Sequence, residues 1–279
     1  MIGKFITHSK ITAKLGQGLF GHWPSWSPTG EAVFWGGWDE NTRNKGLYWQ
    51  RLDQQEAKLI SEGAVSFPYS WHPDFKQLLM YGESAGGSGD LRILTLSGND
   101  KQGWVKENDR DYLVGPDSVD DARISPDGSW VAYTRARPGV QPELWVRAWD
   151  GSKGVKVSIL PIQVTFPSWT DDKRLLYLGA AEDGSKESPV RVLDYTVKGD
   201  RFVPGIPSVW TNIELSALYA YDSKGDRLLV SVTEETVEGD EEPEEYRFND
   251  HVILFEGFGE YLQNELPLPS SMGGERRGD

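Results

Sequence analysis

The chain has 279 residues and no cysteine, and 43 acidic against 29 basic side chains give a formal net charge of −14 at pH 7. The lack of cysteine excludes a disulfide framework, a thiolate zinc site and a cysteine nucleophile. The acidic balance argues against a nucleic-acid clamp, which needs a basic face. No apolar run approaches the roughly 20 residues that cross a bilayer. We therefore expect no membrane insertion, and the N-terminal residues lack the apolar stretch of a secretion signal, which favours a cytoplasmic location.

The composition favours short strands joined by turns. The chain contains 31 glycines, 16 prolines and 12 tryptophans. Glycine and proline are turn residues, while aromatic and β-branched residues are enriched in strands. An all-β protein is predicted before any single segment is considered.

Five segments repeat one pattern along the chain: an apolar residue, a polar turn and a short apolar strand. A repeat of this length indicates a solenoid, a propeller or an array. The segments are 24–35, 69–81, 122–133, 167–178 and 219–230, and their apolar anchor residues are Trp26, Trp71, Ile124, Trp169 and Tyr221, spaced 45, 53, 45 and 52 residues apart.

Each repeat has room for four strands. The anchor ends a first strand, and the turn after it carries proline, which presets φ, or glycine, which tolerates a positive φ, as at Gly30 and Gly128. A further alternating strand follows about 20 residues after each of the first four anchors, for example around Leu47 and Leu144, and 30 residues after the fifth. A last strand precedes the next anchor, as in 57–60 and 155–159. Four strands per repeat indicate a propeller blade.

The ends of the chain are expected to close the ring. The C-terminal repeat supplies three strands, near 216–220, 226–232 and 251–256, and lacks a fourth. Residues Ala13–Leu15 have the same sequence as residues 57–59, which begin the last strand of the first repeat, yet no blade precedes them. We therefore predict that the N-terminal strand completes the C-terminal blade. One propeller domain is predicted over residues 1–267, with a disordered tail over 268–279.

The repeats resemble those of the TolB-like β-propellers. Residues 125–151, which begin SPDGSWVAY, match the SPDG-type repeat best. The likeness is nearest to the C-terminal propellers of bacterial serine/threonine protein kinases, which end in a short aromatic helix. Here Phe258, Tyr261, Leu262 and Leu266 share one helical face. The family usually has six blades and the sequence has five anchors, so five blades are predicted and six remain the alternative. The resemblance implies a protein or peptide partner.

Two motifs imitate catalytic signatures. Residues 82–87 match the esterase pattern G-x-S-x-G around Ser84, but that motif needs a following helix, and glycines lead here into another strand. Gly16, Gly18 and Gly21 have the spacing of a phosphate loop, but Pro24 and Pro28 exclude the helix that must follow. We interpret the first as a hairpin loop and residues 14–23 as a crossover between blades.

The candidate binding residues are those expected at the mouth of the central channel. The first strands of the blades begin near Trp23, Phe67, Asp120, Phe166 and Leu215, and only the third carries acids. A glycosidase needs two carboxylates on opposite sides of the sugar, which one acidic blade cannot supply. The candidate ligand-binding residues, named by strand position alone, are His22, Trp23, Phe67, Asp120, Asp121 and Phe166; ordinary blade packing is the alternative role for each.

The remaining polar features predict no cofactor or metal. The four histidines lie on separate segments without the spacing of a zinc site. Residues 234–245 hold eight acids and are predicted to form a disordered loop that could attract a basic partner. The predicted function is a non-catalytic binding or scaffolding propeller. The alternatives are a propeller hydrolase, glycosidase-like or metal-dependent, with a site in its central channel, and a regulatory relic of a kinase-associated sensor.

Overall fold

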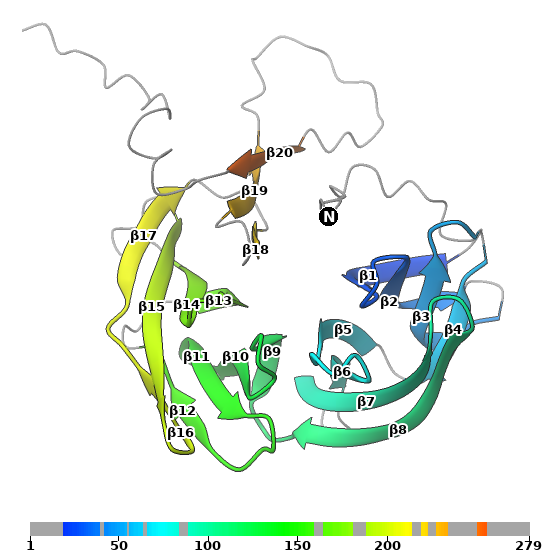
Figure 1. Ribbon diagram of the computed structural model, residues 1–279, viewed down its shortest axis with the longest axis horizontal. Helices are drawn as coiled ribbons and strands as arrows, with labels where there is room; N and C mark the ends of the chain where they lie inside the picture. The colour runs from blue at the N-terminus through cyan, green and yellow to red at the C-terminus, as the bar shows by residue number, and fades with distance from the viewer. Residues whose placement is uncertain are drawn as a thin grey trace, which may run out of the picture. The chain divides into compact units, whose positions relative to one another are not determined.

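The computed structural model shows an all-β chain (Figure 1). No helix occurs in the residues it describes, which are 19–39, 42–54, 56–63, 66–83, 89–158, 164–180, 188–213, 219–222, 227–233 and 250–255. Contacts divide the chain into two compact units, residues 1–214 and residues 215–279, which we describe separately.

The first two sheets of the first unit each contain four antiparallel strands that pair in chain order. The first sheet consists of β1 (Leu19–Trp26), β2 (Ala32–Asp39), β3 (Lys45–Arg51) and β4 (Lys58–Glu62). The second consists of β5 (Ser66–Trp71), β6 (Gln77–Glu83), β7 (Gly89–Asn99) and β8 (Gly103–Leu113). β1 corrects one expectation, because it begins at Leu19 and so includes half of the segment 14–23 that we interpreted as a crossover.

The third and fourth sheets repeat this order. The third consists of β9 (Ser118–Ile124), β10 (Trp130–Arg137), β11 (Val140–Ala148) and β12 (Gly154–Lys156). The fourth consists of β13 (Val164–Trp169), β14 (Arg174–Gly179), β15 (Ser188–Lys198), β16 (Arg201–Pro204) and β17 (Ser208–Ile213). The outermost place of the fourth sheet is shared, because β16 pairs with the C-terminal half of β15 and β17 pairs with its N-terminal half.

The second unit contains one three-stranded antiparallel sheet. Its strands are β18 (Tyr219–Asp222), β19 (Arg227–Thr233) and β20 (Asp250–Phe255), in that order. These are the three strands predicted for the fifth repeat. The predicted closing strand (Ala13–Leu15), the C-terminal helix and the tail lie outside the described residues, so ring closure and the domain boundary at 267 stay predictions.

The predicted turn recurs after the first strand of every sheet in the first unit. In the third sheet the amide of Ser125 donates to Trp130 O at 2.8 Å, and the amide of Gly128 donates to Ser125 O at 2.9 Å. Gly128 has a φ of 75°, which glycine adopts without strain. In the second sheet Phe75 occupies the same place with a φ of 56°. The turn is thus formed even where glycine is absent.

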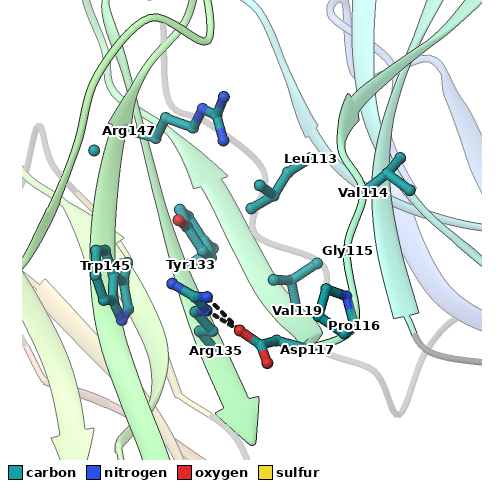
Figure 2. Close-up of a pocket in the computed structure, with 11 residues that line it drawn as sticks. Leu113, Val114, Gly115, Pro116, Asp117, Val119, Tyr133, Arg135, Trp145 and Arg147 are labelled. Carbon is teal, nitrogen blue, oxygen red and sulfur yellow. Dashed lines mark hydrogen bonds and ion pairs between the residues drawn. The ribbon is translucent and has the colours of Figure 1, made fainter.

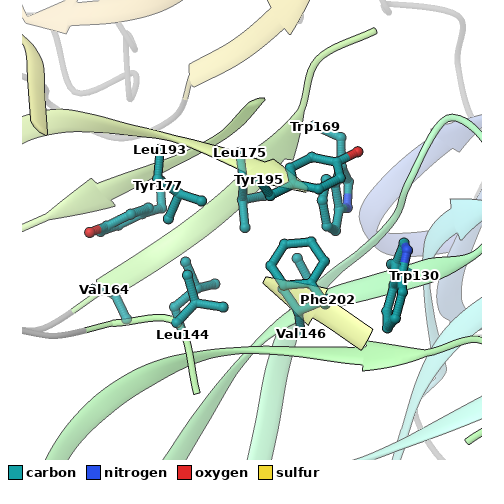
Figure 3. Packing of buried hydrophobic residues seen from close by; sticks show 12 residues of the cluster. Trp130, Leu144, Val146, Val164, Trp169, Leu175, Tyr177, Leu193, Tyr195 and Phe202 are labelled. Atoms are coloured by element: carbon teal, nitrogen blue, oxygen red, sulfur yellow. The ribbon is translucent and has the colours of Figure 1, made fainter. Parts of the chain in front are cut away.

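The core lies between successive sheets. β1 contacts β5, β5 contacts β9, and β9 contacts β13, so the first strand of each sheet lies at a shared inner edge. Between the third and fourth sheets, Phe202 stacks on Tyr195 and meets Trp130 and Trp169 edge-on (Figure 3). Repeated sheets with apolar layers between them form a β-propeller. The described residues form five sheets, one for each anchor, in agreement with the predicted five blades.

Candidate functional site

The inner strands of the first unit are all irregular at the same place. The pairing register shifts between His22 and Ser25 in β1, between Pro68 and Ser70 in β5, opposite Ala132 and Thr134 in β9, and between Thr165 and Ser168 in β13. Such a bulge inserts a residue into one strand and re-aims the side chains around it. The six candidate residues fall at these bulges or directly beside them, three or four positions before the anchor of their repeat.

Two of the bulged residues have a backbone conformation that is rare for their type. Asp121 has a φ of 52° and Phe166 a φ of 50°. The left-handed region is tolerated by aspartate but is strained for a bulky aromatic residue. Strained residues of this kind persist only where the surrounding structure holds them, and they gather at functional sites.

Asp120 is an exposed carboxylate that a neighbouring sheet holds in place. The Tyr69 hydroxyl, on β5, donates a hydrogen bond to Asp120 Oδ1. The amide of Asp121 donates to the same oxygen at 2.8 Å. Asp120 therefore has a defined orientation, while much of its side chain remains accessible to a ligand.

Asp121 is buried, and its charge is poorly compensated. It is 7% exposed, and burial, followed by the nearby charge of Asp120, raises its pKa to about 6. The amide of Phe166 donates to Asp121 Oδ2 at 3.3 Å and opposes this rise, as does the charge of Arg123. The two adjacent aspartates thus differ in character, since one is accessible and the other ionises at a free-energy cost.

Aromatic rings continue the site away from the acids. The Tyr81 ring lies 5.5 Å from Phe67 and 6.2 Å from Tyr69, between ring centroids. The guanidinium of Arg123 lies 5.9 Å from the centre of the Tyr69 ring. Burial also raises the pKa of Tyr69 strongly, so its hydroxyl remains a donor at neutral pH.

The structure brings four of the six candidates together. Phe67, Asp120, Asp121 and the backbone of Phe166 are linked through Tyr69 and Tyr81 across three successive sheets. His22 and Trp23 lie on β1, and their side chains are outside the described part of the chain. Sequence reasoning missed Tyr69, Tyr81 and Arg123. Tyr69 lies at the bulge of β5, and the equivalent part of β9 carries the two aspartates that the sequence analysis selected. Its position in the repeat was therefore the signal that could have identified Tyr69.

Acidic side chains on the described inner strands of the first unit are confined to β9. On the four inner strands of the first unit, the acids are Asp120 and Asp121, which are adjacent on one strand. Within the described ranges no group of three histidine, aspartate or glutamate side chains could hold a metal ion. Ser84 and the acidic run 234–245 lie outside those ranges. The same ranges contain no helix with the length and apolarity to cross a membrane.

No protein-family model matches the chain, and no curated protein matches it. Among solved structures, TolB from Acinetobacter baumannii has a TM-score of 0.54 at 17% identity, over 76% of this chain and 49% of that chain. A putative TolB from Agrobacterium tumefaciens has a TM-score of 0.52 at 18% identity, over 68% and 64%. A puromycin hydrolase has a TM-score of 0.54 at 15% identity, over 78% and 34%. The chain thus spans less than two thirds of each of these proteins, and the likeness shows a TolB-like β-propeller fold.

Proposed function

We propose that the chain is a non-catalytic binding module that holds a peptide or protein segment at the bulged inner strands. The observation that carries this proposal is the pair of aspartates on β9, with Asp120 exposed and held by Tyr69, and Asp121 buried with a raised pKa. The aromatic rings of Phe67 and Tyr81 lie in the same cluster and suit apolar contacts with a ligand.

The acids select the chemistry of the segment. A lysine or arginine side chain next to Asp120 gains an ion pair and also favours the ionised form of Asp121. Binding of a cation therefore lowers the pKa of Asp121 from about 6 and releases protons near that pH. A neutral or acidic segment gains neither effect.

A peptide library that varies one position at a time tests the proposal. We expect binding peptides to share a basic residue. Asp120→Asn should weaken their binding by about ten-fold because it removes the charge, and Tyr69→Phe should weaken it by a similar factor because it removes the hydrogen bond that orients Asp120. Asp109→Asn is the matched control, since Asp109 lies on β8 and pairs with Arg92 away from the inner edge. Calorimetry near pH 6 in two buffers of different ionisation enthalpy should show proton release. Peptides that bind equally to Asp120→Asn, or bind without proton release, contradict the proposal.

A propeller hydrolase is the second candidate, and the raised pKa of Asp121 is the observation that favours it. A panel of nitrophenyl glycosides, with and without added divalent cations, separates the two functions. Hydrolysis that disappears in Asp121→Asn supports the enzyme, and unchanged turnover in that variant assigns the activity to another source.

Three finer expectations stay proposals from the sequence. The kinship with kinase-associated propellers would be supported by a kinase encoded next to this chain. A basic partner for residues 234–245 would bind more weakly as salt concentration rises. A cytoplasmic location can be tested by fractionation of cells.

A further inference from the structure

A cavity lies between the second and third sheets, and its lining includes Val119 but neither Asp120 nor Asp121. Its volume is about 340 Å³, within the range of small-ligand pockets. One wall is the crossover Leu113–Asp117, which leads from β8 to β9, and the other consists of side chains of β10 and β11 (Figure 2). Val119 and Trp145 add apolar surface.

Two arginines and one aspartate line the cavity. Arg135 donates from Nε to Asp117 Oδ2 at 2.6 Å, so these two charges offset each other. Arg147 forms no ion pair with any residue that the structure describes. Its Nε and one terminal nitrogen donate to the Gly151 carbonyl oxygen at 3.1 and 2.5 Å, which leaves the other terminal nitrogen available. The lining thus carries two positive charges and one negative charge, and Asp150 lies within electrostatic reach of Arg147.

Tyr133 supplies a second donor whose partner is missing. Its side chain is 3% exposed and lines the cavity, and its hydroxyl makes no hydrogen bond within the described ranges. Burial raises the pKa of Tyr133, while the charges of Arg147 and Arg135 lower it, so both guanidinium groups lie within electrostatic reach of the hydroxyl. Figure 2 shows Tyr133 among the two arginines and Trp145. The hydroxyl belongs to a residue that lines the cavity and has no protein acceptor among the described residues, so it can donate a hydrogen bond to a ligand.

We propose that this cavity binds a carboxylate carried by an apolar group, with the carboxylate between Arg147 and the Tyr133 hydroxyl. Because the lining holds one more arginine than acid, it matches a monoanion better than a doubly charged phosphate. The apolar group lies against Leu113, Val119 and Trp145. The C-terminal residue of a peptide and a free carboxylic acid share this chemistry. Neither Asp120 nor Asp121 lines this cavity, and the proposal does not depend on the function proposed for them.

Three probes distinguish the sources and test the carboxylate. They are N-acetyl-Ala-Phe with a free C-terminus, the same peptide with a C-terminal amide, and 3-phenylpropanoate, each titrated to about 10 mM by ligand-observed NMR. We expect the free peptide to bind at least about ten-fold more tightly than the amide, because the amide lacks the charge. If 3-phenylpropanoate binds as tightly as the free peptide, the source is a small acid; if it binds more weakly, the source is a peptide terminus.

Two variants and two controls connect binding to the named residues. Tyr133→Phe removes only the hydroxyl, and Arg147→Gln removes the charge; each should weaken the free peptide by about five- to ten-fold. Tyr177→Phe is the matched control, because Tyr177 is 3% exposed at the corresponding place of the fourth sheet. Asp120→Asn should leave this binding unchanged. Arg147 also lies over the Tyr112 ring, so Arg147→Gln is interpreted only if circular dichroism shows a native melting profile. If the profile is not native, Tyr133→Phe decides alone.

Three outcomes overturn the proposal. The amide could bind as tightly as the free acid, Tyr133→Phe could bind as tightly as Tyr177→Phe, or none of the probes could bind by about 10 mM. The first outcome would show that the cavity does not recognise a carboxylate, the second that the Tyr133 hydroxyl does not take part, and the third that the cavity is a packing gap between sheets. Loss of inner-edge peptide binding in Asp120→Asn, with carboxylate binding intact, would show that the two sites are independent.

Discussion

Two junctions between neighbouring sheets differ, although the same repeat forms both. One lies between the third and fourth sheets and the other between the second and third sheets. In the former, Phe202, Tyr195, Trp169 and Trp130 fill the space with edge-on and stacked rings (Figure 3). In the latter, the crossover Leu113–Asp117 leaves a cavity lined by two arginines. Both junctions have a buried apolar core, but the junction between the second and third sheets also keeps a cavity and the buried carboxyl group of Asp121, which reduces stability when it ionises.

The largest expected effect on the free energy of unfolding concerns the junction between the third and fourth sheets. Phe202→Ala removes a ring that is 7% exposed and contacts three other aromatic rings. We expect the free energy of unfolding to fall by about 3–4 kcal/mol, measured by urea denaturation. Val197→Ala, on the same sheet but 44% exposed, is the control and should change it by less than about 0.5 kcal/mol. Equal effects of the two variants would refute the assignment of stability to this junction.

The next effect has the opposite sign and concerns Asp121. The folded chain keeps a proton on Asp121 up to about pH 6, whereas the unfolded chain loses it near pH 3.8. The native state therefore loses stability as pH rises from about 4 to 6, and the loss is complete above that range. Asp121→Asn mimics the protonated form and should raise the free energy of unfolding by about 3 kcal/mol at pH 7 and by nearly nothing at pH 3.5. A gain that is the same at both pH values would exclude ionisation as its cause.

A smaller effect compares equivalent turns of the second and third sheets. Gly128→Ala places a Cβ 2.5 Å from His72 Nε2 at a φ of 75°, so we expect a loss of about 1–2 kcal/mol. Phe75→Gly relieves the left-handed strain at a residue that is 55% exposed, and should gain about 0.5 kcal/mol. Thermal denaturation of both variants measures the contrast. A loss in Phe75→Gly would mean that the Phe75 ring contributes more than its backbone conformation costs.

The smallest effect is expected at the cavity. Tyr133→Phe removes a hydroxyl that has no partner among the described residues, so the free energy of unfolding should change by less than about 0.5 kcal/mol. Urea denaturation measures it beside Phe202→Ala. A loss well above that value would indicate a hydrogen bond to solvent or protein that stabilises the fold.

The sequence predicted the fold better than it predicted the site. The anchors and polar turns identify the strands, because period, proline and glycine act locally. The link between Tyr69 and Asp120 could not be derived, because it joins residues 51 positions apart on different sheets. The positive φ of Phe166 has no local signal either, since phenylalanine disfavours it. β16 and β17 both pair with β15 and together form the outer edge of the fourth sheet, and a repeat pattern does not specify this pairing.

The division of this outer edge between β16 and β17 affects how the chain can associate with copies of itself. Because β15 is covered by one strand of four residues and another of six, no long uninterrupted ladder of backbone donors and acceptors is presented at this side of the sheet. Short edge strands are a common protection against strand addition and aggregation. A second molecule that approached this side would find only brief stretches to pair with, interrupted at Gly205 and Pro207, where proline lacks an amide donor.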